Sequence, residues 1–416
     1  MESQRSYPVL VTLMGLALIA WWWLPSVGVA PNRIVSGTPF TASQVAGWPM
    51  AMLAGLPLLL TVWGAMRMDH QRLAWLLGLV VLCLVGWPLW LLLAAVQLVD
   101  PQLPQARLAI GSGMWLALFL LLLALIELRT RMQLSAWRSW ALFLLPVLVL
   151  AACIPAGLDR LALWQEFVGR RQDFFTAIGV HLLLVIATVA LSLIVGVATA
   201  LMVRRVPQLQ RAVIATLNFL QTIPSLALFG LLLGPLAWLS NRYDWLDALG
   251  VSGIGWAPAL LALVAYSLLP IVRNTLVALD GVDEGVIESA RGMGMSRRQV
   301  FLQVRLPLAV PVILEGIRIT TVQAIGLTAV AALIGAGGLG RFVFQGLGQA
   351  AMDLVLLGAL PIVIMAVAAD ALLAGVTRKL QPELQPEIQT EIQPQPELKT
   401  QSQTQLKPER QPESGE

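Results

Sequence analysis

The chain has 416 residues, of which 58% are hydrophobic and only 12% are charged, and its formal net charge is +4. Soluble domains average about 45–50% apolar and about 25% charged residues. This composition excludes a water-soluble globule and predicts an all-α polytopic membrane protein. The basic residues are scattered through short loops rather than gathered in a stripe, which argues against nucleic acid as a partner.

Ten apolar runs are long enough to be transmembrane helices, which need about 20 mostly apolar residues each. The runs are 9–25, 47–66, 74–98, 108–127, 138–157, 176–202, 212–236, 256–277, 308–336 and 353–377. The loops between them decide the orientation, because cytoplasmic loops carry an excess of arginine and lysine. Most of these basic residues lie on the inner side if the N-terminus is cytoplasmic. We therefore expect both termini to be cytoplasmic.

Composition divides the chain into four segments. Residues 1–157 hold five spans, built mostly from Leu, Ala, Val and Trp. Residues 158–175 mix polar and apolar side chains at helical spacing, which predicts an amphipathic connector at the external interface. Residues 176–380 hold five more spans and the informative motifs. Residues 381–416 repeat Gln-Pro-Glu without any aromatic residue, which is typical of a disordered cytoplasmic tail.

Polar side chains interrupt the seventh run near a proline. Asn218, Gln221 and Thr222 precede Pro224 and Ser225. A proline inside a span frees a backbone carbonyl that needs a polar neighbour, and polar groups in lipid are costly unless they have a role. These five residues are therefore candidates for lining a solute pathway, and a purely structural kink is the alternative.

A polar loop, residues 280–307, separates the eighth and ninth runs. Ile287 and Ala290 repeat at helical spacing, and Gly292 and Gly294 are expected to end that helix.

A second short helix is expected to follow this turn and to end at Arg305, with Ser296 as its N-cap. Its apolar face consists of Val300, Phe301 and Val304. Pro307 then opens the next span, where proline is tolerated in the first helical turn. The pattern predicts a helix-turn-helix that lies flat under the membrane and contacts a cytoplasmic partner.

Two further features lie on and after the ninth run. Glu315 and Arg318 are three residues apart, which makes them neighbours on a helix. We expect a buried ion pair near the cytoplasmic end, and a pathway-lining role is the alternative. The segment Gly335–Gly340 fits the pattern G-x-G-x-x-G but ends a span rather than following a strand, so we expect a turn with close helix packing and not a nucleotide site.

The polar loop resembles the signature of permease subunits of ATP-binding-cassette (ABC) importers. That signature reads Glu-Ala-Ala, three residues, Gly, nine residues, Ile, one residue, Leu-Pro. The matching residues are Glu288, Ala290, Gly294, Leu306 and Pro307, and the departures are Ser289 and Val304. The resemblance implies that this loop, with Gly292 in its turn, docks on an ATPase subunit and couples it to the spans.

Four strings narrow the resemblance to osmoprotectant permeases of the betaine, carnitine and choline type. They begin at Gln221, Tyr266, Glu288 and Ile334. The resemblance implies a C-terminal five-helix type I ABC importer core in a bacterial inner membrane. It also implies an external substrate-binding protein and a second permease, either a copy of this chain or a paralogue.

No constellation of nucleophile, base or metal ligands converges in the sequence of the spans. All three lysines, Lys379, Lys399 and Lys407, follow the last run, so a P-loop, which needs a lysine, is not expected and ATP hydrolysis falls to a separate subunit. No catalytic group, metal site or cofactor is expected. Two alternatives stay open: an ABC permease for amino acids or another small solute, and an ion-coupled secondary transporter, which needs ionisable residues at the membrane midplane.

Overall fold

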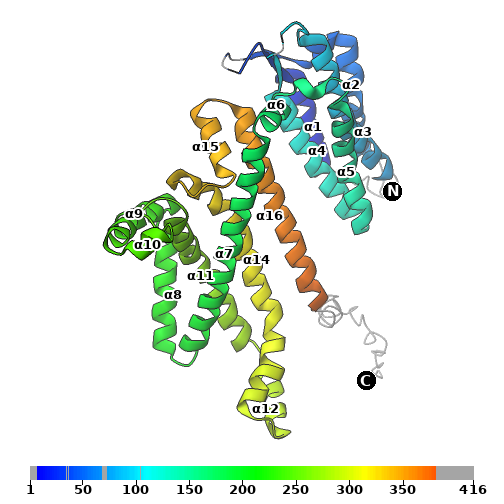
Figure 1. The fold of residues 1–416 in the computed structure, drawn as a ribbon. Helices are drawn as coiled ribbons and strands as arrows, with labels where there is room; N and C mark the ends of the chain where they lie inside the picture. Colours follow the sequence, from blue (N-terminus) through cyan, green and yellow to red (C-terminus); the bar gives the residue numbers. More distant parts are fainter. Residues whose placement is uncertain (1–6, 34, 36, 68–72, 104, 381–416) are drawn as a thin grey trace, which may run out of the picture. The chain divides into compact units, whose positions relative to one another are not determined.

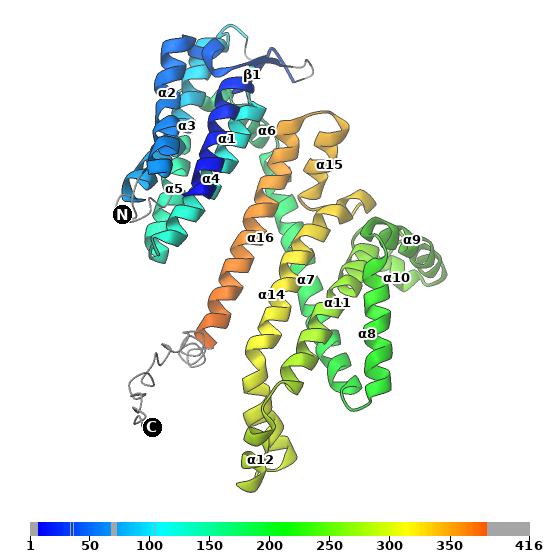
Figure 2. The ribbon, with the colours of Figure 1, turned by 180° about the vertical axis from the view of Figure 1, so that it is seen from behind.

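The computed structural model describes residues 7–33, 35, 37–67, 73–103 and 105–380. Figures 1 and 2 show the fold from two opposite sides. The tail predicted for residues 381–416 lies outside the described residues. The chain divides into two compact units: unit 1 comprises Met1–Ile186, Pro224–Ala262 and Ile325–Ile364, and unit 2 comprises Ala187–Ile223, Leu263–Ala324 and Met365–Glu416.

Five helices at the start of unit 1 lie side by side (Figures 1 and 2). They are α1 (Pro8–Trp23), α2 (Ala42–Arg67), α3 (Leu73–Leu98), α4 (Ser112–Arg131) and α5 (Ala136–Cys153). Helix α1 packs on α2 and α4, and α3 packs on α2, α4 and α5. Their shared core is leucine-rich, with Leu10 and Leu76 fully buried. The Trp21 indole N–H donates to the Ala51 carbonyl at 3.2 Å, which ties α1 to α2.

A small antiparallel sheet at one end of these helices departs from the all-α expectation. Its strands are β1 (Val27–Ala30), β2 (Thr38–Phe40) and β3 (Arg107–Ile110). Strand β1 is central and pairs with both neighbours, with Val27 opposite Phe40 and Ile110. The predicted run 108–127 is therefore wrong at its start, because β3 takes its first residues and α4 begins at Ser112. A short apolar stretch does not distinguish strand from helix by its periodicity.

The second half of the chain is helical apart from its turns. Its helices are α6 (Ala162–Gly169), α7 (Arg171–Val203), α8 (Pro207–Thr222), α9 (Ser225–Arg242), α10 (Asp244–Ala248), α11 (Trp256–Asp280), α12 (Glu284–Gly292), α13 (Arg297–Gln299), α14 (Leu306–Ala331), α15 (Gly340–Gly348) and α16 (Met352–Leu380). The connector 158–175 is not one helix, since Arg170 leaves the helical conformation after Gly169 and α7 begins at Arg171.

Seven helices in the described part of the chain are long and apolar enough to cross a membrane, or eight if the broken pair α8 and α9 counts as one span. Helices α1 and α5 are apolar but shorter. Each predicted run thus coincides with an apolar helix or with this broken pair, and the predicted number of ten spans is approximate. The run 212–236 is wrong as one continuous helix, because α8 ends at Thr222 and α9 begins at Ser225.

Candidate functional site

The loop singled out by its sequence pattern begins with α12, in unit 2 (Figure 1). Asp283 is the N-cap, and its carboxylate accepts a hydrogen bond from a backbone N–H at 2.6 Å. Ile287 and Ala290, which repeat at helical spacing, are 0% and 2% exposed and form the inward face of α12. Helix α12 ends at Gly292, and Gly294 follows with a φ of +83°, a left-handed conformation that glycine adopts without strain.

The second helix begins at Arg297 with Ser296 as its N-cap, as predicted. The Ser296 hydroxyl accepts a hydrogen bond from the backbone N–H of Gln299 at 3.3 Å, and the Gln299 side chain accepts one from the backbone N–H of Ser296 at 2.8 Å. This reciprocal pair is a capping box, which satisfies backbone donors at the start of a helix. The turn between α12 and α13 is therefore defined by local hydrogen bonds.

The expected separate helix ending at Arg305 is wrong, because the chain continues from α13 into α14 without a break. The connection is a π-helical turn, η3 (Val300–Arg305), in which the Leu306 N–H donates to the Phe301 carbonyl five residues earlier. In a regular α-helix the ring of Pro307 clashes with the carbonyl four residues before it. The wider π turn relieves that clash and lets the span extend into the loop.

One apolar cluster packs α12 against η3, and a second packs the end of α11 against η3 and the start of α14. The first cluster contains Val282, Ile287, Ala290 and Val300 with Met295 and Val304, and the second contains Ala278, Leu279 and Ala309 with Phe301, Val312 and Ile313. The predicted apolar face of the second helix therefore packs inward. Arg204, after α7, donates to Asp280 at 2.6 Å and to the Leu279 carbonyl at 3.2 Å. Helix α12 thus packs on η3, which continues directly into α14.

The opposite face of α12 and its turn is exposed. Glu288 and Gly292 are solvent-exposed, Val286 is 44% exposed and Met293 is 77% exposed. Methionine is a flexible, polarisable side chain that is favoured in contacts between proteins. The arrangement is a short helix held by its inner face and open to a partner on its outer face.

Arg318 is the centre of a three-residue ion cluster on α14 and α16, in unit 2. It donates to both carboxylate oxygens of Asp370, at 2.6 and 2.9 Å, and lies 3.4 Å from Glu315. The predicted pair exists, but its stronger partner is Asp370, 52 residues further along the chain. The side chains of Glu315, Arg318 and Asp370 are 43%, 30% and 44% exposed, so the pair is less buried in this chain than predicted.

The polar residues of α8 have different environments. The Gln221 side chain donates to the Tyr266 carbonyl at 2.8 Å, and the Thr222 hydroxyl donates to the Phe219 carbonyl at 2.7 Å. Asn218 is exposed and lines an open hollow of about 450 Å³ along one face of α8. Of the predicted stripe, Asn218 lines this hollow.

A backbone carbonyl freed at the break after α8 has a hydrogen-bond partner. The Tyr266 hydroxyl donates to the Ile223 carbonyl, directly before Pro224, the N-cap of α9. This is the kind of polar neighbour that a proline break in a span requires. Pro224 and Ser225 belong to unit 1, whereas Gln221 and Thr222 belong to unit 2.

The glycine-rich segment after α14 is a turn. Gly335, Gly337 and Gly338 have φ values of +81°, +80° and +77°. A Cβ atom on Gly340 would lie 1.9 Å from the Ala329 carbonyl oxygen. The glycines permit a left-handed turn and a close approach of α15 to α14, as expected for packing.

Histidine and cysteine serve packing in the described residues. His181 is fully buried and its Nε2 lies 3.1 Å from the Ile325 carbonyl oxygen. Within the described ranges no group of three or more His, Cys, Asp or Glu side chains could hold a metal ion.

Two family models match this chain. The model described as "Binding-protein-dependent transport system inner membrane component" matches residues 192–383. The model described as "ABC transporter permease YehY, N-terminal domain" matches residues 4–164.

Curated relatives match about half of this chain. The carnitine transport permease protein OpuCB of Listeria monocytogenes is 38% identical over 203 residues, which cover 49% of this chain and 86% of that protein. The glycine betaine/carnitine/choline transport system permease protein OpuCB of Bacillus subtilis is 37% identical over 205 residues, covering 49% and 87%. The osmoprotectant import permease protein OsmW of Salmonella typhimurium is 42% identical over 203 residues, covering 49% and 89%.

The matches to the curated relatives cover most of each relative's length, and the first family model spans the loop built around α12. The long apolar helices agree with a membrane subunit. The chain belongs to the family of binding-protein-dependent transport system inner membrane components, the permease subunits of ABC importers.

Proposed function

We propose that this permease imports quaternary-ammonium osmoprotectants, with glycine betaine as the first candidate. The observation that carries this proposal is the 37–42% identity to permeases whose names specify carnitine, glycine betaine, choline or osmoprotectants. A permease for amino acids or another small solute is the alternative. The proposed location is the inner membrane of a bacterium, with both termini cytoplasmic and no catalytic role for this subunit.

Transport requires three kinds of partner. An external binding protein delivers the solute and supplies the aromatic cage that holds a quaternary ammonium by cation–π attraction. A second permease, identical or paralogous, completes the pathway, and a cytoplasmic ATPase drives the cycle. The exposed residues Glu288, Gly292 and Met293 form the surface that docks on the ATPase. Ile287 and Ala290 pack with Val300 of η3, which continues into α14. This packing supports transmission of the ATPase's motion to the spans.

The solute path is proposed to follow polar groups in the spans. Asn218, which lines the hollow beside α8, and the Glu315–Arg318–Asp370 cluster are the candidates that the contacts within unit 2 support. Charged groups inside spans usually face water or the protein interior, because exposure to lipid is costly. Gln221 and Thr222 bond to backbone carbonyls, so they hold the break after α8.

The direct test is uptake of labelled glycine betaine into vesicles that contain this permease, its ATPase and its binding protein. We expect uptake that requires ATP. Replacement of Glu288 by alanine should lower this uptake, because Glu288 is part of the proposed docking surface. Since the Glu288 side chain is exposed, the fold should stay intact in this variant. ATPase stimulation by the binding protein without uptake of betaine, choline or carnitine would keep the importer and reject the substrate. Uptake driven by an ion gradient without an ATPase would reject the mechanism.

Substitution of Gly294 tests the backbone conformation of the turn independently of the residues on its surface. Its φ is +83° and an added Cβ would meet no atom within 4 Å, so any effect comes from backbone strain. A non-glycine residue in this conformation costs about 1–2 kcal/mol, and asparagine tolerates it best. We expect the amount of solute transported per ATP hydrolysed to fall least in Gly294→Asn, more in Gly294→Ala and most in Gly294→Val. Wild-type coupling in the valine variant would contradict the role of this turn.

A further inference from the structure

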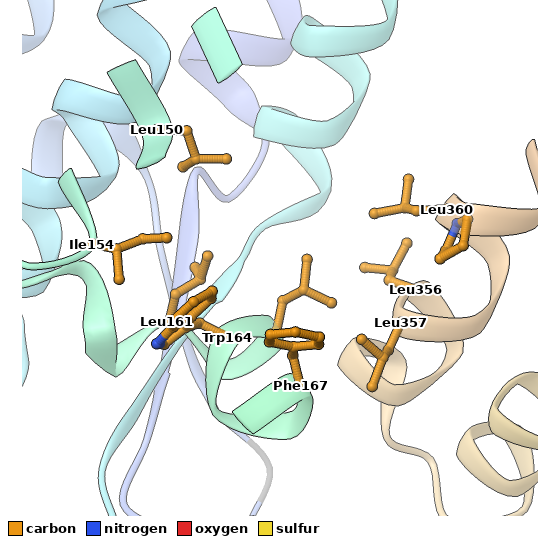
Figure 3. A pocket seen from close by; sticks show the side chains of 10 residues that line it. Leu150, Ile154, Leu161, Trp164, Phe167, Leu356, Leu357 and Leu360 are labelled. Carbon is orange, nitrogen blue, oxygen red and sulfur yellow. The ribbon is translucent and has the colours of Figure 1, made fainter. Parts of the chain in front are cut away.

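An apolar groove of about 310 Å³ lies beside α6 in unit 1 (Figure 3). Trp164 and Phe167 of α6 form one wall, Ile154 after α5 contributes a second, and Leu356 and Leu360 of α16 contribute a third. Every residue that lines the groove is apolar. The groove is thus built to hold an apolar occupant.

The position of the groove narrows the choice of occupant. Leu356 and Leu360 lie four and eight residues inside the start of α16, about 6 and 12 Å along a helix axis. Helix α16 is one of the spans, so the groove is at the depth of lipid tails. Water is excluded because no polar group could bind it, and an empty apolar space forfeits packing contacts. A lipid acyl chain is the molecule available at this depth.

A cluster of arginines surrounds the same short helix. Glu166 of α6 is only 6% exposed and faces three guanidinium groups: Arg33 at 3.0 Å, Arg107 at 3.0 Å and Arg170 at 3.3 Å. Asp353, at the start of α16, interacts electrostatically with Arg107 and Glu166. Three positive charges thus face two carboxylates, which leaves the cluster with excess positive charge.

The arginines also have unused donors. Arg33 donates to the Gln349 side chain at 2.8 Å and Arg170 donates to the Gln345 side chain at 3.3 Å, both on α15. The Nε atom of Arg107 is buried and has no hydrogen-bond partner. Each guanidinium carries five donor hydrogens arranged in a fork that matches phosphate oxygens. The cluster therefore retains donors for a further anion.

The arginine cluster lies at the depth of a phospholipid headgroup, and the groove lies at the depth of its acyl chains. Arg170 directly precedes the long span α7, and Asp353 lies in the first turn of α16, so both mark the ends of spans, where headgroups lie. Basic pockets between spans are known to hold anionic headgroups. Since α6 contributes Trp164 and Phe167 to the groove and Glu166 to the cluster, a single lipid can contact both.

We propose that unit 1 binds one anionic phospholipid, with an acyl chain in the groove of α5, α6 and α16 and the phosphate on Arg33, Arg107 and Arg170. The lipid joins the helices of the N-terminal half to α16. Its phosphate also neutralises the positive charge of the arginine cluster that the two nearby carboxylates do not balance.

The test uses the full chain in nanodiscs of phosphatidylcholine alone or with phosphatidylglycerol. We expect phosphatidylglycerol to raise the melting temperature by several degrees and to remain bound, one molecule per chain, in native mass spectrometry. Leu356→Trp, and separately Leu360→Trp, fill the groove and should reduce retention to about a tenth, a loss of about 1.4 kcal/mol in binding. Leu372→Trp is the matched control, because Leu372 is 71% exposed on the same helix and should retain the lipid.

Three results would overturn the proposal. They are equal retention of both lipids, unchanged retention in both groove-filling variants, and the same thermal stabilisation by inorganic phosphate alone, which would show that no acyl chain takes part. Glu166→Gln tests the headgroup site. It leaves the arginines short of negative charge, so its stability should depend on phosphatidylglycerol more than that of the wild type. A loss of stability that phosphatidylglycerol does not restore would assign the cluster a structural role only.

Discussion

Replacement of Gly340 by alanine is expected to destabilise unit 1 by about 3 kcal/mol or more. The added Cβ would lie 1.9 Å from the Ala329 carbonyl oxygen and 2.7 Å from the Ala329 carbonyl carbon. Both atoms belong to the backbone of α14, so relief of the clash requires α14 and α15 to move apart. A flexible side chain could turn aside, whereas a helical backbone cannot.

The matched control for this substitution is Gly348→Ala, in the same helix. A Cβ on Gly348 would meet no atom within 4 Å, so the change in unfolding free energy should stay within about 0.5 kcal/mol. The melting temperature of the detergent-solubilised protein, followed by size-exclusion fluorescence, measures both variants. Equal melting temperatures would show that α15 does not pack on α14 as closely as the structure has it.

Replacement of Arg318 by glutamine is expected to reduce solute uptake by at least about tenfold, because it leaves two carboxylates unpaired inside spans. Asp370 loses both of its short contacts, at 2.6 and 2.9 Å. Glu315 loses a contact of only 3.4 Å. Glu315→Gln should therefore reduce uptake less than Arg318→Gln does. Uptake rate and the yield of monodisperse protein are the measurements.

A double substitution tests the pairing of Arg318 with Asp370 separately from the other contacts of Arg318. If the unpaired Asp370 causes the defect, Arg318→Gln combined with Asp370→Asn should recover yield relative to Arg318→Gln alone, because no uncompensated charge remains in this pair. Recovered yield without recovered uptake would assign Arg318 to the pathway as well as to the fold. A double variant that folds no better than the single variant would contradict the pairing.

Local features of this protein could be predicted from its sequence. The apolar runs identify the membrane-spanning helices, because such a helix needs about 20 mostly apolar residues in succession and the loops of this chain contain no run of that length. The capping box at Ser296, the inward face of Ile287 and Ala290 and the turn at Gly294 depend on residues close together in the chain. Backbone geometry over a few residues determines these features. The docking of this loop on an ATPase remains a proposal.

Features that depend on distant segments could not be predicted in this way. The π turn before Pro307 was missed, and the kink considered at Pro224 is a complete break between two helices. Hydropathy reports the length of an apolar run and not its hydrogen-bond register. Asp370 pairs with Arg318 across 52 residues, and Glu166 meets Arg33 from far along the chain.

The sequence by itself therefore determined the membrane class, the helical runs and the capped loop, since side-chain chemistry over one or two helical turns is sufficient for these. Only the tertiary structure decided the ion cluster around Arg318, the arginine cluster around Glu166 and the groove beside α6. Each of these requires helices or strands that are remote in the chain to pack together. A single sequence contains no local pattern that specifies such packing.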